Sequence, residues 1–315
     1  MKRIAKFLKI FFLSIVVILV IVFILFGHAD KSLAELKPKY ANEASAFIRI
    51  DSMDVHYRDE GITTDSLPIV LLHGTGASLH TFDDWVAVLK NENRVVRMDL
   101  PAFGLTGPFP DRNYSIEKYV DFMNDFLQAK GISKCILVGN SLGGQIAYRF
   151  TIAHPQMVDK LILIDAAGYP LESKSVPIAF RIAQMPILNK VIKYITPRFM
   201  VRSSVENVYA DKTKVTDTLV DRYFALALIA GNRQALVDRM TLAFDSTTIP
   251  LIKNIQQSTL ILWGEQDLLI PTKSAYRFHN DLPNDTLVIL KNLGHVPMEE
   301  GARESLEVVM GFLKR

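Results

Sequence analysis

Residues 137–145 read LVGNSLGGQ and place Ser141 between glycines, where an apolar run ends and a helical pattern begins. A chance Gly-x-Ser-x-Gly pattern is expected in about one chain in ten of this composition, so the pattern alone is weak. Its position is more informative, because a strand-to-helix turn exposes the serine hydroxyl and points the helix N-terminus at it. Side chains at Gly139 and Gly143 would collide with neighbouring backbone. The stretch alone does not decide whether Ser141 is a nucleophile or part of a plain turn, but its position favours a nucleophile.

A serine hydroxyl needs a base, and histidine is the usual one. Most of the seven histidines have structural explanations and His80 is undecided, but His295 lies in a loop, LGHVPMEE, just after the last apolar run. Asp267 follows the preceding apolar run, TLILWG, by a few residues. Both side chains are therefore expected at the sheet edge where Ser141 emerges. The chain order Ser141, Asp267, His295 is the order expected for a triad on such a sheet.

Two other aspartates end apolar runs and compete with Asp267 for the role of the acid. Asp99, in MDLPAFG, is interpreted as organising its own loop. Asp165, in LILIDAA, is an alternative acid. The acid is needed to fix the tautomer of His295 and to stabilise its charged form.

The loop HGTGAS, residues 73–78, is expected to bind negative charge on a carbonyl oxygen. It follows the strand IVLL and is rich in small residues, which let a ligand approach backbone N–H groups. We assign the two donors to the backbone N–H groups of Thr75 and Leu142, each usually worth about 3 kcal/mol. The alternative is an ordinary glycine turn.

The N-terminal segment is apolar enough to span a membrane. Phe7–Phe26 reads FLKIFFLSIVVILVIVFILF, and about 20 residues at a rise of about 1.5 Å match a hydrocarbon layer of about 30 Å. Four basic residues precede or enter this run: Lys2, Arg3, Lys6 and Lys9. The positive-inside rule then places the rest of the chain on the exported side, periplasmic or extracellular. The alternative is secretion after cleavage near residues 27–29, but the run exceeds the usual apolar region of a signal peptide, ~7–15 residues.

The net charge of +3 comes from this segment. Residues 1–31 hold five of the 36 basic and one of the 33 acidic residues, which leaves 31 positive against 32 negative charges. A near-neutral remainder gives no electrostatic reason to expect nucleic acid as a partner. Cys135, the only cysteine, excludes an intrachain disulfide and is interpreted as a buried residue.

Strand and helix patterns alternate beyond the N-terminal segment. The segments FIRI and VHYRDEG predict a hairpin, and six solid apolar runs predict buried parallel strands: PIVLLHG, RVVRMDL, CILVGN, LILIDAA, TLILWGE and TLVILKN. Helices are expected after Ser115, ending at Gly131, and after Ser141, ending at Pro155. This order predicts an α/β fold with a doubly wound, mostly parallel sheet.

One region, residues 169–247, lacks strand patterns. Helices are expected over residues 215–230 and 233–244, the second capped by Asn232. An all-helical insertion at this point predicts a lid above the carboxyl edge of the sheet. Three of its apolar residues are assigned either to an acyl pocket or to the core of the lid: Ile187, Phe199 and Met200.

The chain thus divides into five predicted parts. They are a membrane anchor (1–28), a polar linker (29–46), the first part of the α/β core (47–168), the helical lid (169–247) and the second part of the core (248–315).

Five segments together resemble the α/β-hydrolase superfamily: HGTG at 73–76, DLPAFG at 99–104, GNSLGG at 139–144, WGEQD at 263–267 and GHVP at 294–297. The resemblance runs from about Phe47 to the C-terminus. Within the superfamily the chain is similar to membrane-anchored, monoacylglycerol-lipase-like serine esterases, to bacterial family V lipases and to meta-cleavage carbon–carbon hydrolases. Ala102 stands where these families commonly have glycine. Ser141 argues against dehalogenases and epoxide hydrolases, which use an aspartate nucleophile.

The resemblance and the site residues imply a serine hydrolase that cleaves carboxylic esters with an apolar acyl chain. The reaction needs no metal and no organic cofactor. The expected partners are a small-molecule ester or lipid and, through the N-terminal helix, a membrane, while nothing in the sequence fixes an oligomeric state.

Two alternative functions stay open. Cleavage of a carbon–carbon bond in a vinylogous diketone uses the same triad, and such dianionic substrates require basic residues, for which Arg181, Arg198 and Arg202 are available. A membrane anchor favours esters. A membrane-tethered binding protein without catalysis is the second alternative, and the complete triad argues against it.

Overall fold

A computed structural model describes residues 2–315, and its centre is an eight-stranded sheet in the order β1-β2-β4-β3-β5-β6-β7-β8. The strands are β1 Ser45–Ile50, β2 Met53–Gly61, β3 Ile69–Leu72, β4 Arg94–Met98, β5 Cys135–Asn140, β6 Val158–Ile164, β7 Ser258–Gly264 and β8 Asp285–Leu290. The β1–β2 hairpin and the β2–β4 pair are antiparallel, and all other neighbours are parallel. This topology confirms the doubly wound, mostly parallel sheet.

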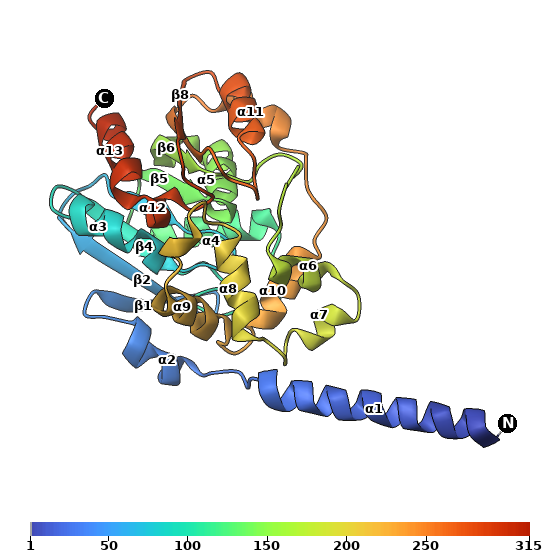
Figure 1. The fold of residues 1–315 in the computed structure, drawn as a ribbon. Helices are drawn as coiled ribbons and strands as arrows, with labels where there is room; N and C mark the ends of the chain where they lie inside the picture. The colour runs from blue at the N-terminus through green and yellow to red at the C-terminus, as the bar shows by residue number, and fades with distance from the viewer. Residues whose placement is uncertain (1) are drawn as a thin grey trace.

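Helices cover both faces of the sheet (Figure 1). Their bounds are α1 Lys2–Phe26, α2 Leu33–Tyr40, α3 Asp83–Leu89, α4 Ile116–Ala129, α5 Leu142–Ala153, α6 Ile178–Gln184, α7 Leu188–Val191, α8 Arg198–Glu206, α9 Asp217–Ala227, α10 Asn232–Met240, α11 Lys273–Asp281, α12 Pro297–Glu300 and α13 Ala302–Leu313. One apolar core packs α4, α5 and α11 against the sheet, through residues such as Phe122, Ile146 and Phe278. A second core packs α3 and α13 against the other face, through Trp85 and Val309. Strands β3 and β5 are buried along their whole length, as their unbroken apolar runs predict.

The expected ends of α4 are confirmed. The Ser115 side chain accepts a hydrogen bond from the backbone N–H of Lys118, and Gly131 adopts a φ of 64°, the left-handed conformation that ends helices.

The stretch between β6 and β7 (residues 165–257), which we call the helical insertion, contains α6 to α10 and no strand. Its last helix differs from our expectation, because α10 begins at Asn232 and is preceded by Gly231 at a φ of 86°. The Asn232 side chain donates to the carbonyl oxygens of Gly104 and Leu226 instead of capping the helix. The helix also ends at Met240, four residues before the expected end.

Residues 29–46 differ from the expected polar linker, because they contain α2. The Ser32 side chain and the Glu35 side chain cap each other's backbone N–H groups and start this helix. Leu36 and Tyr40 are buried in a small apolar cluster with Leu226 of the helical insertion. The segment is therefore packed onto the domain.

Helix α1 projects away from the domain (Figure 1), and it is long and apolar enough to cross a membrane, with a mean hydropathy of 3.2 over an 18-residue window within Arg3–Phe26. The residues after it pair with the helical insertion through two isolated β-bridges, Gly27 with Ile195 and Lys31 with Ile229. The carbonyl oxygen of His28 also accepts a hydrogen bond of 2.8 Å from the Arg233 guanidinium. The base of α1 is thus attached to the insertion.

The turn between β5 and α5 has no room for side chains at its glycines. A Cβ atom at Gly143 would overlap the carbonyl oxygen of Leu72, and one at Gly139 would overlap the carbonyl oxygen of Gly143. Both obstacles are backbone atoms of strands or of the turn itself, so they cannot move aside cheaply. The requirement for these two glycines, expected from the sequence, is confirmed.

We predict that Gly143→Ala destabilises the fold by more than ~2 kcal/mol, because the added carbon overpacks the turn. Gly311→Ala is the matched control: Gly311 lies in α13, and a Cβ there has nothing within 4 Å. Alanine in a helix interior should stabilise that site by about 0.5–1 kcal/mol. Thermal unfolding of both variants in detergent should give shifts of opposite sign, and equal shifts would contradict the proposed crowding at Gly143.

Candidate active site

Ser141 lies in the turn between β5 and α5 with a backbone that few residues adopt, φ 54° and ψ −114°. Its N–H donates to the carbonyl oxygen of Ile164 at 3.0 Å, and its carbonyl oxygen accepts from the N–H groups of Gln145 and Ala167, each at 3.0 Å. Such strain persists only where surrounding structure holds it, and it occurs often at functional sites. The local geometry thus fits the predicted nucleophile.

Asp267 and His295 are brought together from the loops after β7 and β8. The Asp267 Oδ2 lies 2.7 Å from the His295 Nδ1. The other carboxylate oxygen, Oδ1, accepts from the N–H groups of Leu269 and Ile270 at 2.8 and 2.9 Å. Because both oxygens are engaged, the carboxylate is fixed and holds the Nδ1 proton of the imidazole, which leaves Nε2 as the basic nitrogen.

The backbone of His295 is tied to the residue that precedes the serine. The Asn140 side chain donates to the carbonyl oxygen of His295 at 3.0 Å and to that of Ile164 at 3.2 Å. Within residues 2–315 as described, Ser141 and His295 share no side-chain hydrogen bond. The acid–base pair is formed, and the hydrogen bond from serine to histidine often tightens only when substrate binds.

Asp165, the alternative acid, lies at the same place but does not contact the imidazole in the same way. It is buried, its backbone has a φ of 44°, and its Oδ1 accepts from the N–H of Gly264 at 3.0 Å. Burial, and then the neighbouring charge of Asp267, raise the pKa of Asp165 well above its usual value. Its Oδ2 is buried without a partner in the part of the chain described. A protonated Asp165 can use this oxygen to donate to Asp267, so the two carboxyls need not both be ionised.

The same three side chains offer ligand atoms within 4.8 Å of one another: Asp165, Asp267 and His295. This spacing by itself would suit a metal ion. However, both oxygens of Asp267 and the Nδ1 of His295 are already engaged. The arrangement fits a hydrogen-bonded acid–base pair better than a set of metal ligands.

The interpretation of Asp99 as the organiser of its loop is confirmed. Its carboxylate accepts from the N–H groups of Leu79 and Leu105, both at 2.8 Å, and pairs with the His56 Nδ1 at 2.7 Å. Burial would raise the pKa of Asp99, but the charge and hydrogen bond of His56 outweigh burial and lower it.

In the same loop Ala102 has a φ of 85°, which explains why glycine is common at this position in similar families.

A cavity of about 430 Å³ opens beside the nucleophile. Its walls combine the turn residues Thr75, Ser141 and Leu142 with residues of the helical insertion, among them Phe180 and Met240. A Cβ on Gly74 would lie 3.0 Å from the Ser141 Cβ, so the loop that carries Thr75 approaches the serine closely. The two proposed oxyanion donors therefore belong to residues that line the same cavity as Ser141.

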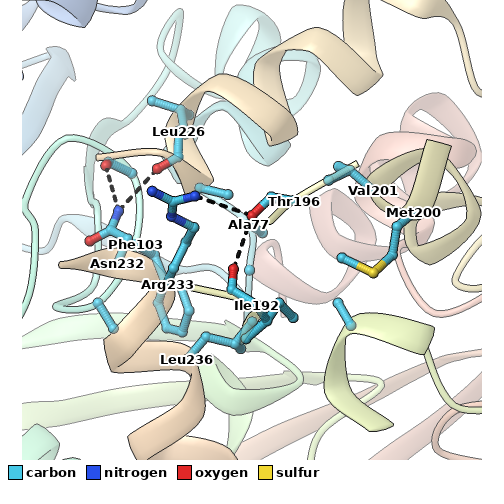
Figure 2. Close-up of a pocket in the computed structure, with 15 residues that line it drawn as sticks. Ala77, Phe103, Ile192, Thr196, Met200, Val201, Leu226, Asn232, Arg233 and Leu236 are labelled. Carbon is cyan, nitrogen blue, oxygen red and sulfur yellow. Dashed lines mark hydrogen bonds between the residues drawn. The ribbon is translucent and has the colours of Figure 1, made fainter. Parts of the chain in front are cut away.

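The three apolar residues assigned to an acyl pocket lie elsewhere. Ile187 and Phe199 are 73% and 64% exposed and are not among the residues that line the Ser141 cavity. Met200 lines a separate, smaller cavity of about 80 Å³, which also contains Phe103 and Leu236 (Figure 2). The apolar residues that do line the Ser141 cavity are Leu142, Ala167, Leu171, Val176, Phe180, Met240, Leu269 and Ile270.

Arg239 is a site residue that sequence reasoning missed. It lines the Ser141 cavity from α10. The three arginines considered from the sequence do not line it: Arg198 and Arg202 pair with Asp217, and Arg181 is exposed. No local signal distinguishes Arg239, because its position depends on how α10 packs over the sheet edge.

The chain matches the model of the alpha/beta hydrolase family over residues 69–308. It is 24% identical over 277 residues to the 2-hydroxy-6-oxo-6-(2'-aminophenyl)hexa-2,4-dienoic acid hydrolase of Metapseudomonas resinovorans, covering 85% of this chain and 90% of that protein. Two solved structures have the same fold at 24% identity. One is a meta-cleavage product hydrolase from Pseudomonas fluorescens IP01 (TM-score 0.73, 85% of this chain and 97% of that chain). The other is a membrane phospholipase A (TM-score 0.73, 100% of this chain and 98% of that chain).

The chain belongs to the alpha/beta hydrolase family. It is accordingly a hydrolase, and its sheet, strand order and N-terminal apolar helix agree with the fold class predicted from the sequence.

The two buried aspartates provide a matched pair of substitutions. We predict that Asp267→Asn lowers kcat by ~10³–10⁴-fold, because an amide facing Nδ1 favours the wrong imidazole tautomer. Asp165→Asn should keep kcat within ~10-fold, because an amide can donate as the neutral acid does. Steady-state kinetics on one ester, with circular dichroism to check folding, measures both. A larger loss for Asp165→Asn would identify Asp165 as the acid.

Proposed function

We propose that this hydrolase cleaves carboxylic esters with an apolar acyl chain, using Ser141 as nucleophile, His295 as base and Asp267 as acid. The observation that carries the proposal is the strained Ser141 backbone in the wall of a largely apolar cavity, together with the hydrogen-bonded His295–Asp267 pair, whose histidine backbone is held by Asn140, the residue before the serine. A strained backbone conformation persists at a residue only where the surrounding structure holds it, and such residues cluster at functional sites.

The proposed reaction is acyl transfer to water. His295 Nε2 takes the Ser141 proton as the oxygen attacks the ester carbonyl, and the N–H groups of Thr75 and Leu142 stabilise the oxyanion. The protonated imidazole, held by Asp267, then gives its proton to the leaving alcohol. Water repeats the steps on the acyl-enzyme and releases the acid.

Hydrolysis of a carbon–carbon bond is the second candidate function. Relatives and structural neighbours named for this reaction share the fold, and Arg239 lines the cavity with Ser141, where it can contact an anionic substrate. The apolar walls and the N-terminal apolar helix support the ester reaction, because they suit a lipid-like substrate held near a membrane.

We further propose that α1 is an uncleaved membrane anchor, with the domain on the exported side. Residues 27–31 pair with the helical insertion, so cleavage there would remove bonds that hold the insertion. Residues 173–205 carry six basic and no acidic residues. Exposed apolar side chains gather in the same segment: Met185, Ile187, Leu188, Val191 and Tyr194. Apolar, aromatic and basic side chains together suit a membrane interface.

The function is tested with p-nitrophenyl esters of rising acyl length on the wild type and on Ser141→Ala. We expect turnover to fall at least ~10³-fold in the variant, because the nucleophile is lost. A fluorophosphonate probe should label Ser141 in the wild type and fail to label His295→Ala. Equal turnover of wild type and Ser141→Ala, or persistent labelling of His295→Ala, would count against these roles.

The membrane placement is tested with a fluorophore on Ile187→Cys in the full chain reconstituted into anionic vesicles. Labelling is selective because Cys135 is buried and burial raises the pKa of its thiol to about 12. We expect a blue-shifted emission that lipid-borne quenchers reduce, whereas a fluorophore on Val88→Cys, which is exposed on α3, should report water. The same aqueous emission at both sites, in protein that stays with the vesicles, would show that α1 anchors a domain whose insertion stands clear of lipid.

A further inference from the structure

Arg239 is the only charged residue among those that line the Ser141 cavity in the described chain. The remaining lining residues are apolar or carry neutral hydroxyl and amide groups. Arg239 also lines the neighbouring cavity, together with Gln145, whose side chain its guanidinium contacts. Its position makes it a contact for anything bound near the nucleophile.

Arg239 lacks the carboxylate partner that the buried arginines of this protein have. The four arginines that are most buried all form ion pairs: Arg58 with Asp83, Arg97 with Glu60, Arg149 with Glu117 and Asp245, and Arg233 with Asp30. No ion pair involves Arg239 within residues 2–315 as described. Its one hydrogen bond is a long contact of 3.4 Å from Nη2 to the Gln145 Oε1, and its Nε is buried without a partner.

A guanidinium held in this way is costly unless something compensates it. Burial lowers the pKa of Arg239 below its ordinary value, yet an arginine side chain stays protonated in proteins. The charge is therefore retained in a largely apolar cavity with most of its donors unused. An anion bound there would form charge-assisted, two-pronged hydrogen bonds with the planar guanidinium.

We propose that Arg239 binds a negatively charged group of the substrate in the Ser141 cavity, so that the enzyme prefers anionic over neutral substrates. The inference rests on the proposed function, whose substrate class it narrows to esters that carry a carboxylate or a phosphate apart from the scissile bond. Both anions offer the guanidinium fork a pair of oxygens that can accept two parallel hydrogen bonds, so the same cavity can hold either.

The test compares two esters of equal chain length, p-nitrophenyl valerate and mono-p-nitrophenyl glutarate, in which a carboxylate replaces the terminal methyl group, each rate being corrected for spontaneous hydrolysis without enzyme. The wild type should prefer the glutarate. In Arg239→Gln the ratio of kcat/KM for glutarate over valerate should fall by ~10–100-fold, chiefly through KM, because a charged hydrogen bond is lost. Arg303→Gln is the matched control, because Arg303 is exposed on α13 and lies outside the cavity lining, and its ratio should equal that of the wild type.

A second pair of substrates shows whether the preferred anion is a carboxylate or a phosphate. Lysophosphatidic acid and monoacylglycerol of equal chain length are assayed on the same enzyme variants. If Arg239→Gln loses the preference for the anionic substrate in either pair, the result supports the proposal and identifies the anionic group that Arg239 binds. If the ratio of kcat/KM for the anionic over the neutral substrate is unchanged in both pairs, the proposal is overturned. Arg239→Lys keeps a charge and should retain part of the preference, which separates loss of charge from damage to the fold.

The anion site can be tested separately from the ester reaction. If the wild type cleaves no ester, the binding of glutarate and of inorganic phosphate to the full-length wild type and to Arg239→Gln can still be measured by calorimetry. Weaker binding to Arg239→Gln supports the site while rejecting the ester reaction, and equal binding of both anions rejects the site itself.

Discussion

The backbone of Ser141 is the constraint on which the site depends. A positive φ at a non-glycine residue costs about 1–3 kcal/mol, and here three backbone hydrogen bonds hold it, one of them to Ile164 at the end of β6. The position of Ser141 therefore depends on the pairing of β5 with β6. Asn140 extends this coupling, because its side chain joins the end of β6 to the backbone of His295. The base is thus positioned by the same sheet edge that strains the nucleophile.

Much of this arrangement was predictable because it is local or set by sheet topology. Unbroken apolar runs gave the parallel strands, and the carboxyl edge of a parallel sheet necessarily gathers the loops that carry Ser141, Asp267 and His295. Capping at Ser115 was equally local. The capping box of Ser32 and Glu35 was also present in the sequence, yet the segment was assigned to a polar linker, since its apolar contacts with Leu226 are distant along the chain.

What the sequence did not show depends on packing between distant elements. Ile187 and Phe199 are apolar and lie in the insertion, but apolar character alone does not tell an inward from an outward face, and both side chains are largely exposed. Arg239 faces inward although charge normally favours the surface. The behaviour of Asp165 depends on the folded structure for another reason, because only its burial close to Asp267 raises its pKa well above the usual value.

The charges around the nucleophile show why an anionic substrate suits this site. Burial and the charge of Asp267 raise the pKa of Asp165 well above its usual value, while the carboxylate of Asp267 pairs with His295 and the guanidinium-bearing Arg239 lines the Ser141 cavity. In the proposed acylation step the imidazolium of His295 and the oxyanion form together, so their charges balance each other, while Asp267 is already committed to the imidazole. Neither the oxyanion nor the Asp267 carboxylate is therefore free to balance the positive charge of Arg239 during the reaction. In a cavity with few dipoles to solvate it, a substrate that brings its own negative group supplies the compensation that the protein lacks.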